Sequence, residues 1–155
     1  MIVSEIFAEL TLQDQEATAG LGRRIASVLG IGDAVLLSGP LGAGKTVLAR
    51  AILQALGVSG RIPSPTFTLV QSYETADFQV HHFDLYRVEN ESELIELGFD
   101  DAVETGVILV EWPEHAFGQV PDSALKIEIR PLDGDARNVR LSGGRRWHDF
   151  LEEYR

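Results

Sequence analysis

Residues 39–46 read G-P-L-G-A-G-K-T and match the phosphate-binding loop pattern G-x-x-x-x-G-K-[ST] without a gap. Glycines in such a loop let the backbone turn where a side chain would collide with a phosphate, and the freed N–H groups form an anion cradle. The lysine of the pattern reaches the β and γ phosphates, and the final hydroxyl ligates Mg²⁺. The predicted nucleotide contacts are Gly39, Leu41, Gly42, Ala43, Gly44, Lys45, Thr46 and Val47.

A carboxylate at the end of an apolar strand is the expected second part of such a site. Chemistry on a triphosphate needs a metal ion held and a water or acceptor placed. Residues 107–110 form a continuous apolar run, typical of a strand buried on both faces, and Glu111 follows it directly. Ligands collect at the C-terminal ends of such strands. We therefore predict that Glu111 holds Mg²⁺ through water or orients the attacking water; the alternative is a carboxylate that simply becomes exposed there.

A second carboxylate comes from the segment His82-Phe83-Asp84. Strand alternation puts His82 and Asp84 on one face, and Asp84 at the strand end is a candidate to assist Mg²⁺ or the γ phosphate. His81, His82 and Asp84 also suggest zinc, but a structural zinc site usually has four ligands and no other cluster offers them, so no zinc is expected. A histidine on a sheet face is more often a satisfied structural residue.

Two further residues are candidates for contact with the nucleotide. Thr66 follows the phosphate-loop helix, where nucleotide switches often place a threonine that senses the γ phosphate. Thr68 is the other candidate in this segment, and an ordinary loop is the alternative. Trp112 either packs in the core or lies near the nucleotide. The predicted catalytic residues are Glu111, Asp84 and Lys45, and the predicted metal ligands are Thr46 and Glu111.

The elements around the loop fit its expected position. Residues 34–37 are a short apolar run of strand type, and residues 47–56 have helical spacing that ends at Gly57, a natural C-terminal cap. The loop would then lie at a helix N-terminus, where the partial positive charge favours phosphate.

The remaining elements alternate between helical and strand-like patterns. Thr11 and Asp14 have the spacing of a capping box, which predicts a helix that begins there and ends at Gly30. The other expected elements are a hairpin of strands 67–73 and 78–86, a helix over 91–97 closed by Gly98, a second hairpin around 125–129 and 139–141, and a terminal helix over 146–154.

This order predicts an α/β fold with helices on both sides of the sheet, a three-layer sandwich. The sheet is expected to be mixed, partly parallel around the phosphate loop, with antiparallel hairpin additions. The length of 155 residues suits a single domain, residues 1–155, with a sizeable core.

Composition and net charge indicate where the protein acts and which class of partner it binds. The hydrophobic content of 45% and the absence of an apolar stretch of membrane-spanning length predict a globular protein with no membrane contact. The N-terminus lacks a signal-peptide pattern and the chain has no cysteine, so a cytoplasmic location is expected. The formal charge of −11 argues against a large direct contact with nucleic-acid phosphates and favours docking on another protein. Solubility alone is the other interpretation of this charge.

Four segments together resemble the TsaE family, also called YjeE, the ATPase component of bacterial tRNA threonylcarbamoyladenosine synthesis. They are L-G-A-G-K-T at 41–46, S-P-T-F-T-L-V at 64–70, H-F-D-L-Y-R at 82–87 and V-E-W-P at 110–113. The phosphate loop is common to many families, but the combination is highly specific. The resemblance covers nearly the whole chain, up to about Leu141, and nothing is carried over to the tail.

The resemblance implies a P-loop NTPase-like fold and slow, Mg²⁺-dependent ATP hydrolysis inside a larger assembly. Asp84, Glu111 and Thr46 match family residues that serve metal binding and hydrolysis, and Trp112 matches an aromatic near that site. The implied partners are the TsaB and TsaD proteins, with tRNA reached only indirectly. Pro40 replaces the aspartate usual in the family's loop and lacks an N–H. Thr11 is a candidate base contact by position only.

Two other functions remain open from the residues alone. A small-molecule kinase would use the same loop, because a fold does not choose the phosphate acceptor, although no long basic insert resembles a lid. A non-catalytic nucleotide sensor would bind ATP only to set its affinity for a partner. A GTPase is less favoured, because the chain contains no [NT]-K-x-D segment.

Overall fold

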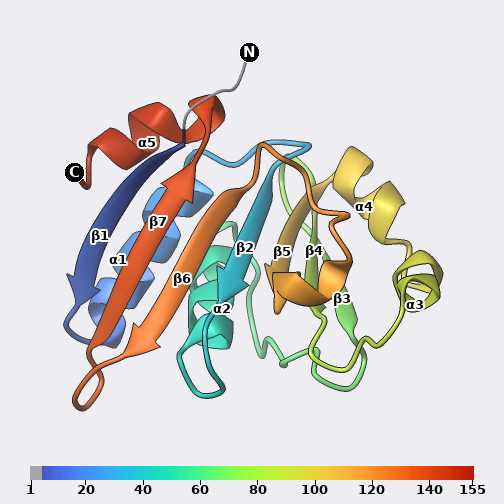
Figure 1. Ribbon diagram of the computed structural model, residues 1–155, viewed down its shortest axis with the longest axis horizontal. Coiled ribbons are helices and arrows are strands. Elements are labelled where there is room, and N and C mark those ends of the chain that lie inside the picture. The colour runs from blue at the N-terminus through green and yellow to red at the C-terminus, as the bar shows by residue number, and fades with distance from the viewer. Residues whose placement is uncertain (1–4) are drawn as a thin grey trace.

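A seven-stranded sheet organises the chain in the computed structural model, which describes residues 5–155 (Figure 1). Residues 1–4, which the predicted domain boundaries include, lie outside the described part. The strand order is β1-β7-β6-β2-β5-β4-β3. The strands are β1 (Ile6–Leu12), β2 (Ala34–Ser38), β3 (Val70–Glu74), β4 (Gln79–Asp84), β5 (Val107–Glu111), β6 (Leu125–Pro131) and β7 (Arg137–Gly143).

The sheet is parallel at its centre and antiparallel at both margins. Strand β2 pairs in parallel with β5 and β6, and β4 pairs in parallel with β5. The β3–β4 and β6–β7 pairs are antiparallel hairpins, and β1 adds to β7 in antiparallel fashion. The mixed sheet with two hairpins was therefore predicted correctly.

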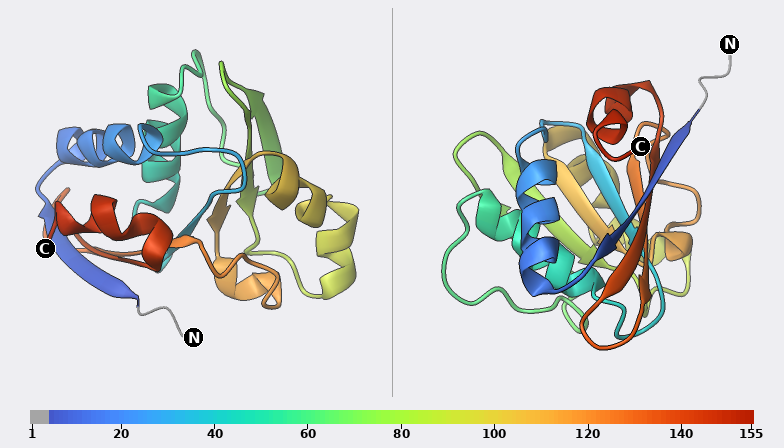
Figure 2. Two further views of the ribbon diagram at one scale, coloured as in Figure 1. Left: turned by 90° about the horizontal axis from the view of Figure 1, so that it is seen from above. Right: turned by 90° about the vertical axis from the view of Figure 1, so that its left-hand side faces the viewer.

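Helices cover both faces of this sheet, so the predicted three-layer α/β fold is confirmed. Helices α1 (Gln15–Ala26), α2 (Lys45–Ala55) and α5 (His148–Glu152) contribute to one core, and α3 (Glu91–Glu96) and α4 (Phe99–Thr105) to the other. Figure 2 shows α1 and α2 on the opposite side of the sheet from α3 and α4. Two 3₁₀ helices, η1 (Pro113–Ala116) and η2 (Arg145–Trp147), complete the fold. None of the helices within residues 5–155 is long and apolar enough to cross a membrane.

Strand alternation determines which side chains face α2. Every residue of β5 is buried, with Leu109 in the core under α1 and α2 and with Ile108 and Val110 in the core under α3 and α4. Because successive side chains point to opposite faces, Glu111 shares the face of Leu109. The apolar run therefore ends by presenting a carboxylate to the helix that follows the phosphate loop.

The predicted capping box at the first helix is wrong. Asp14, not Thr11, caps α1: its backbone is extended and its Oδ1 accepts a hydrogen bond from the Ala17 N–H at 2.9 Å. Thr11 instead belongs to β1, where it pairs with Asn138 of β7. This edge strand was not predicted from the sequence. A serine or threonine pattern near a helix start is a local signal, and here the pairing of β1 with β7 overrides it.

Other differences concern element ends. Strand β3 begins at Val70 instead of residue 67, because the Leu69 N–H donates to the Pro65 carbonyl in a turn and Leu69 has φ 69°. Helix α4 was not predicted; it follows α3 after Gly98, whose φ of 73° redirects the chain. The terminal helix is shorter than predicted, since η2 precedes α5.

Candidate functional site

The phosphate-binding motif forms the connection from β2 to α2. Gly39, Gly42 and Gly44 have φ values of 148°, 77° and 109°, which side chains rarely adopt. Gly44 is the N-cap of α2, and no side chain among residues 5–155 caps this helix end. The first-turn N–H groups of a helix have no intrahelical partners. The loop and helix end therefore offer the N–H cradle and positive dipole that a phosphate group requires.

Lys45 lies inside this loop. Its Nζ donates to the carbonyls of Gly39 and Pro40, the latter at 3.3 Å, and lies 3.7 Å from the ring centroid of Trp112. Burial lowers the pKa of Lys45, and the nearby carboxylates of Glu111, Glu114 and Asp84 oppose that shift. The ammonium group is thus held between the loop and the carboxylates, with an aromatic face against it.

Two carboxylates form the neighbouring edge of the sheet. Asp84 and Glu111 are the last residues of β4 and β5 and pair directly in the parallel register. Asp84 is only 5% exposed to solvent and Glu111 only 2%. The Thr46 hydroxyl donates a hydrogen bond of 2.8 Å to Oε1 of Glu111. The last residue of the phosphate motif is therefore in contact with a carboxylate that lies 65 positions later in the sequence.

Asp84 is held by a different set of donors. Its Oδ2 accepts from the Thr66 hydroxyl at 3.3 Å, and its Oδ1 accepts from the Tyr86 backbone N–H at 3.0 Å. Thr68 instead accepts a hydrogen bond from the Gln71 side chain at 3.3 Å. Of the two threonines considered for the switch segment, Thr66 is therefore the one in contact with a site carboxylate.

His82 contacts Glu111, an interaction that was not predicted from the sequence. Its Nε2 lies 2.7 Å from Oε2 of Glu111, and both side chains are almost fully buried. An ionised carboxylate only accepts hydrogen bonds, so this contact places the proton on Nε2 when Glu111 is ionised. The placement of His82 and Asp84 on one strand face was the available signal, but the partner on β5 depends on the register between strands.

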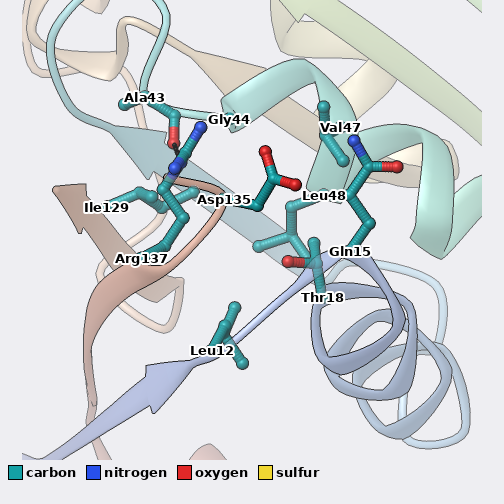
Figure 3. A pocket seen from close by; sticks show the side chains of 10 residues that line it. All are labelled: Leu12, Gln15, Thr18, Ala43, Gly44, Val47, Leu48, Ile129, Asp135 and Arg137. Atoms are coloured by element: carbon teal, nitrogen blue, oxygen red, sulfur yellow. Dashed lines mark hydrogen bonds between the residues drawn. The ribbon is translucent and has the colours of Figure 1, made fainter. Parts of the chain in front are cut away.

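A cavity lies beside the phosphate loop, between α1, α2 and the β6–β7 connection. Figure 3 shows Arg137 and Asp135 on one side and Gln15 and Thr18 of α1 on another. The Arg137 Nε donates to the Ala43 carbonyl at 2.7 Å and ties β7 to the loop. The other lining residues are Leu12, Ala43, Gly44, Val47, Leu48 and Ile129. Apolar walls with a few polar groups are typical of a small-molecule site.

The predicted nucleotide contacts thus have unequal positions. Val47, Ala43 and Gly44 line the cavity, whereas the Leu41 side chain is 69% exposed at the loop tip. Thr11 is exposed and is not a lining residue; alternation on β1 turns its neighbour Leu12 inward instead. Gln15, Thr18, Asp135 and Arg137 were missed, because no local pattern shows that α1 and the β6–β7 connection line the same cavity.

The donor set suits a triphosphate with Mg²⁺. Thr46 and Glu111 supply hydroxyl and carboxylate oxygens, which Mg²⁺ prefers, and there is open space beside Gly42 where a side chain would stand. Within residues 5–155 there is no group of three or more His, Cys, Asp or Glu side chains that could hold a metal ion. Mg²⁺ is bound largely by water and substrate phosphates, so one hydroxyl and one carboxylate are a sufficient contribution from the protein.

Comparison with known proteins gives a consistent result. Residues 12–139 match the family model described as threonylcarbamoyl adenosine biosynthesis protein TsaE. The TsaE protein of Haemophilus influenzae is 44% identical over 108 residues, covering 69% of this chain and 68% of that protein. The TsaE protein of Rickettsia felis is 39% identical over 129 residues, covering 83% and 75%. The crystal structure of Bacillus subtilis YdiB superposes with a TM-score of 0.74 and 27% identity, covering 99% of this chain and 95% of YdiB.

Proposed function

This chain belongs to the TsaE family of tRNA threonylcarbamoyladenosine biosynthesis proteins, and from that premise we propose that it is a Mg²⁺-dependent ATPase. The observation that carries the proposal is the hydrogen bond of 2.8 Å from Thr46 to Glu111. It joins the phosphate-binding loop to a buried carboxylate at the end of a central strand. Metal-assisted hydrolysis needs the phosphate loop and an acidic residue close enough to hold one metal ion between them.

The nucleotide would lie along the loop and into the adjoining cavity. The N–H groups of the loop and α2, with the Lys45 ammonium, bind the phosphates. Leu12, Val47 and Leu48 provide apolar contact for the base, and Gln15 and Asp135 offer hydrogen-bonding groups. We propose these cavity residues in place of Thr11 as the base contacts.

Asp84 and Glu111, at the ends of β4 and β5, form a carboxylate edge of the sheet. This carboxylate edge would supply the hydrolytic part of the reaction. Thr46 and Glu111 are the residues that would hold Mg²⁺, which neutralises charge on the β and γ phosphates when bound. Asp84 and Thr66 lie at the same edge and orient groups at the γ-phosphate end. Trp112 shields Lys45 from solvent on one side.

The wider role follows from the family. We propose that ATP hydrolysis acts on a TsaB–TsaD complex in the cytoplasm, with tRNA reached only through those partners. The formal charge of −11 supports docking on protein instead of direct binding to RNA phosphates. This role predicts co-purification with TsaB and TsaD.

The decisive experiment measures ATP turnover by the purified chain with and without TsaB and TsaD, comparing wild type with Lys45→Ala. Turnover that rises with the partners and falls sharply in the variant, at an ATP concentration that just saturates the wild type, supports the proposal. Absence of turnover in the complete mixture contradicts it.

Two companion measurements separate the alternatives. Equal modification activity with a non-hydrolysable ATP analogue would identify a nucleotide sensor. A phosphorylated product in a metabolite screen would identify a kinase. A kinase could use Arg87 as a phosphate contact, but here its Cζ lies 4.6 Å from the ring centroid of Phe67.

A further inference from the structure

We propose that His82 is a positioning residue that orients the Glu111 carboxylate toward Thr46 and the metal site, an inference that rests on the proposed ATPase function. The imidazole is fully buried, and its Nε2 lies 2.7 Å from Oε2 of Glu111. His82 faces Glu111 and is not a lining residue of the cavity beside the loop. It therefore acts through Glu111 and not on the nucleotide directly.

Two donors hold the carboxylate from different elements. Thr46 of α2 donates to Oε1 at 2.8 Å and lies 3.1 Å from Oε2, while His82 of β4 donates to Oε2. The terminal torsion of a glutamate is otherwise broad. With both donors in place, the plane of the carboxylate is determined, and Oε1 stays directed at the hydroxyl that would ligate Mg²⁺.

The sheet register brings the two side chains together. His82 pairs with Leu109 in the parallel β4–β5 ladder, and Glu111 lies two residues farther along on the same face. His82 therefore reaches Glu111 diagonally, beneath the pair formed by Asp84 and Glu111. One strand, β4, thus carries both a site carboxylate and the support for the other carboxylate.

The second ring nitrogen argues against a purely structural role. Nδ1 of His82 is buried and has no hydrogen-bond partner among the described residues. Most buried polar groups in proteins are paired, and an unpaired one costs free energy. Among residues 5–155, Glu111 is the one hydrogen-bond partner of this ring, so the buried imidazole makes its polar contact with the proposed site.

Three variants test this inference. His82→Phe keeps the ring shape without a donor, His82→Gln returns an N–H near the position of Nε2, and His82→Asn has an amide too short to reach. Affinity for the fluorescent nucleotide mant-ADP is measured in EDTA and in Mg²⁺, together with kcat and KM for ATP in the presence of the partners. Melting temperatures report on folding.

We expect His82→Phe to bind mant-ADP in EDTA within about twofold of wild type, since the loop and Lys45 are intact. Its gain in affinity on adding Mg²⁺, and its kcat, should fall about 10- to 100-fold, the usual effect of losing a group that orients a metal ligand. KM should change little. His82→Gln should recover most of both losses. If His82→Phe does not fold, His82→Asn must show the same pattern.

Three results would overturn the inference: unchanged Mg²⁺ coupling and kcat in a folded His82→Phe or His82→Asn protein, equal losses in the Phe and Gln variants, or lost affinity in EDTA. Failure of the proposed function looks different. In that case the wild-type protein itself has no ATP turnover with its partners, whereas the mant-ADP measurements still report whether His82 affects the metal site.

Discussion

The phosphate loop and the carboxylate edge are neighbours in space but are built in opposite ways. The loop is eight consecutive residues whose binding groups are mainly backbone N–H groups and one lysine. The carboxylate edge gathers Asp84, Glu111 and His82 from two strands, and its groups are side chains. The proposed phosphate binding therefore depends on residues that are local in sequence, whereas the chemistry that would use the metal depends on strand register.

This difference implies a division of labour. Changes in the loop should reduce nucleotide affinity, because they remove contacts to the phosphates in every state. Changes at the carboxylate edge should reduce turnover and Mg²⁺ dependence while leaving metal-free affinity nearly intact. Thr46 belongs to both parts, since it ends the motif and donates to Glu111.

The largest expected effect is at the carboxylate edge. Glu111→Gln keeps the shape but removes the negative charge opposite Thr46 and His82, and we expect kcat to fall about 10²- to 10³-fold, comparable to losing one transition-state electrostatic contact. Steady-state ATPase assays measure the loss, and mant-ADP affinity in EDTA is the control. Normal turnover in Glu111→Gln and Glu111→Ala would remove this carboxylate from the proposed chemistry.

The loop should respond through binding instead. Lys45→Ala removes a charged hydrogen-bond donor to phosphate, worth about 1.5–3 kcal/mol, so affinity should weaken roughly 10- to 150-fold even without Mg²⁺. Titration calorimetry with ATP in EDTA measures it. Lys126→Ala is the matched control, because that lysine lies on the exposed face of β6 and pairs with Glu5. Retained ATP affinity in Lys45→Ala would contradict the proposal that the loop determines nucleotide affinity.

A smaller effect is expected where a distant strand supports the loop. Arg137→Gln loses the hydrogen bond from Nε to the Ala43 carbonyl, and we expect mant-ADP affinity to weaken by about tenfold, from the worth of a hydrogen bond made by a charged group. Arg140→Gln on the same strand is the control, since its exposed pair with Glu9 is worth little. Equal affinities in the two variants would show that the loop holds its shape unaided.

The smallest effect concerns His81, which lies on the opposite face of β4 from His82. Its Nδ1 contacts the Ser72 hydroxyl at 2.7 Å, and burial lowers its pKa below 6.5 despite Asp101 and Glu74. The unfolded chain then binds the proton first, so the free energy of unfolding should decrease as pH falls below 6.5 and level off below the folded pKa. Above pH 6.5 His81 should have no effect on this slope.

Urea unfolding between pH 5 and 7.5 measures this dependence, and His81→Gln should flatten it relative to wild type. ATP turnover at pH 7.5 should be unchanged by the variant, since His81 faces away from Glu111. A loss of turnover without a change in the pH slope would show that the two faces of β4 are not independent.

The sequence predicted those parts whose cause is local. The glycine spacing of residues 39–46, the apolar run before Glu111 and the alternation of His82 with Asp84 each reflect the geometry of one loop or one strand. The mixed sheet and both hairpins followed from the same periodicities. Local patterns failed at Thr11, where a helix-start signal lies in an edge strand.

What only the tertiary structure decided is which side chains meet. The parallel register of β4 and β5 sets Asp84 beside Glu111 and His82 beneath it, and the β6–β7 connection brings Arg137 to the loop. A one-residue shift between β4 and β5 would turn the opposing side chains to different faces. Sequence alone therefore determined the phosphate-binding motif and its place between a strand and a helix, because the backbone geometry of one loop suffices for that. The arrangement of the carboxylates and their supports depends on contacts between residues far apart in the chain.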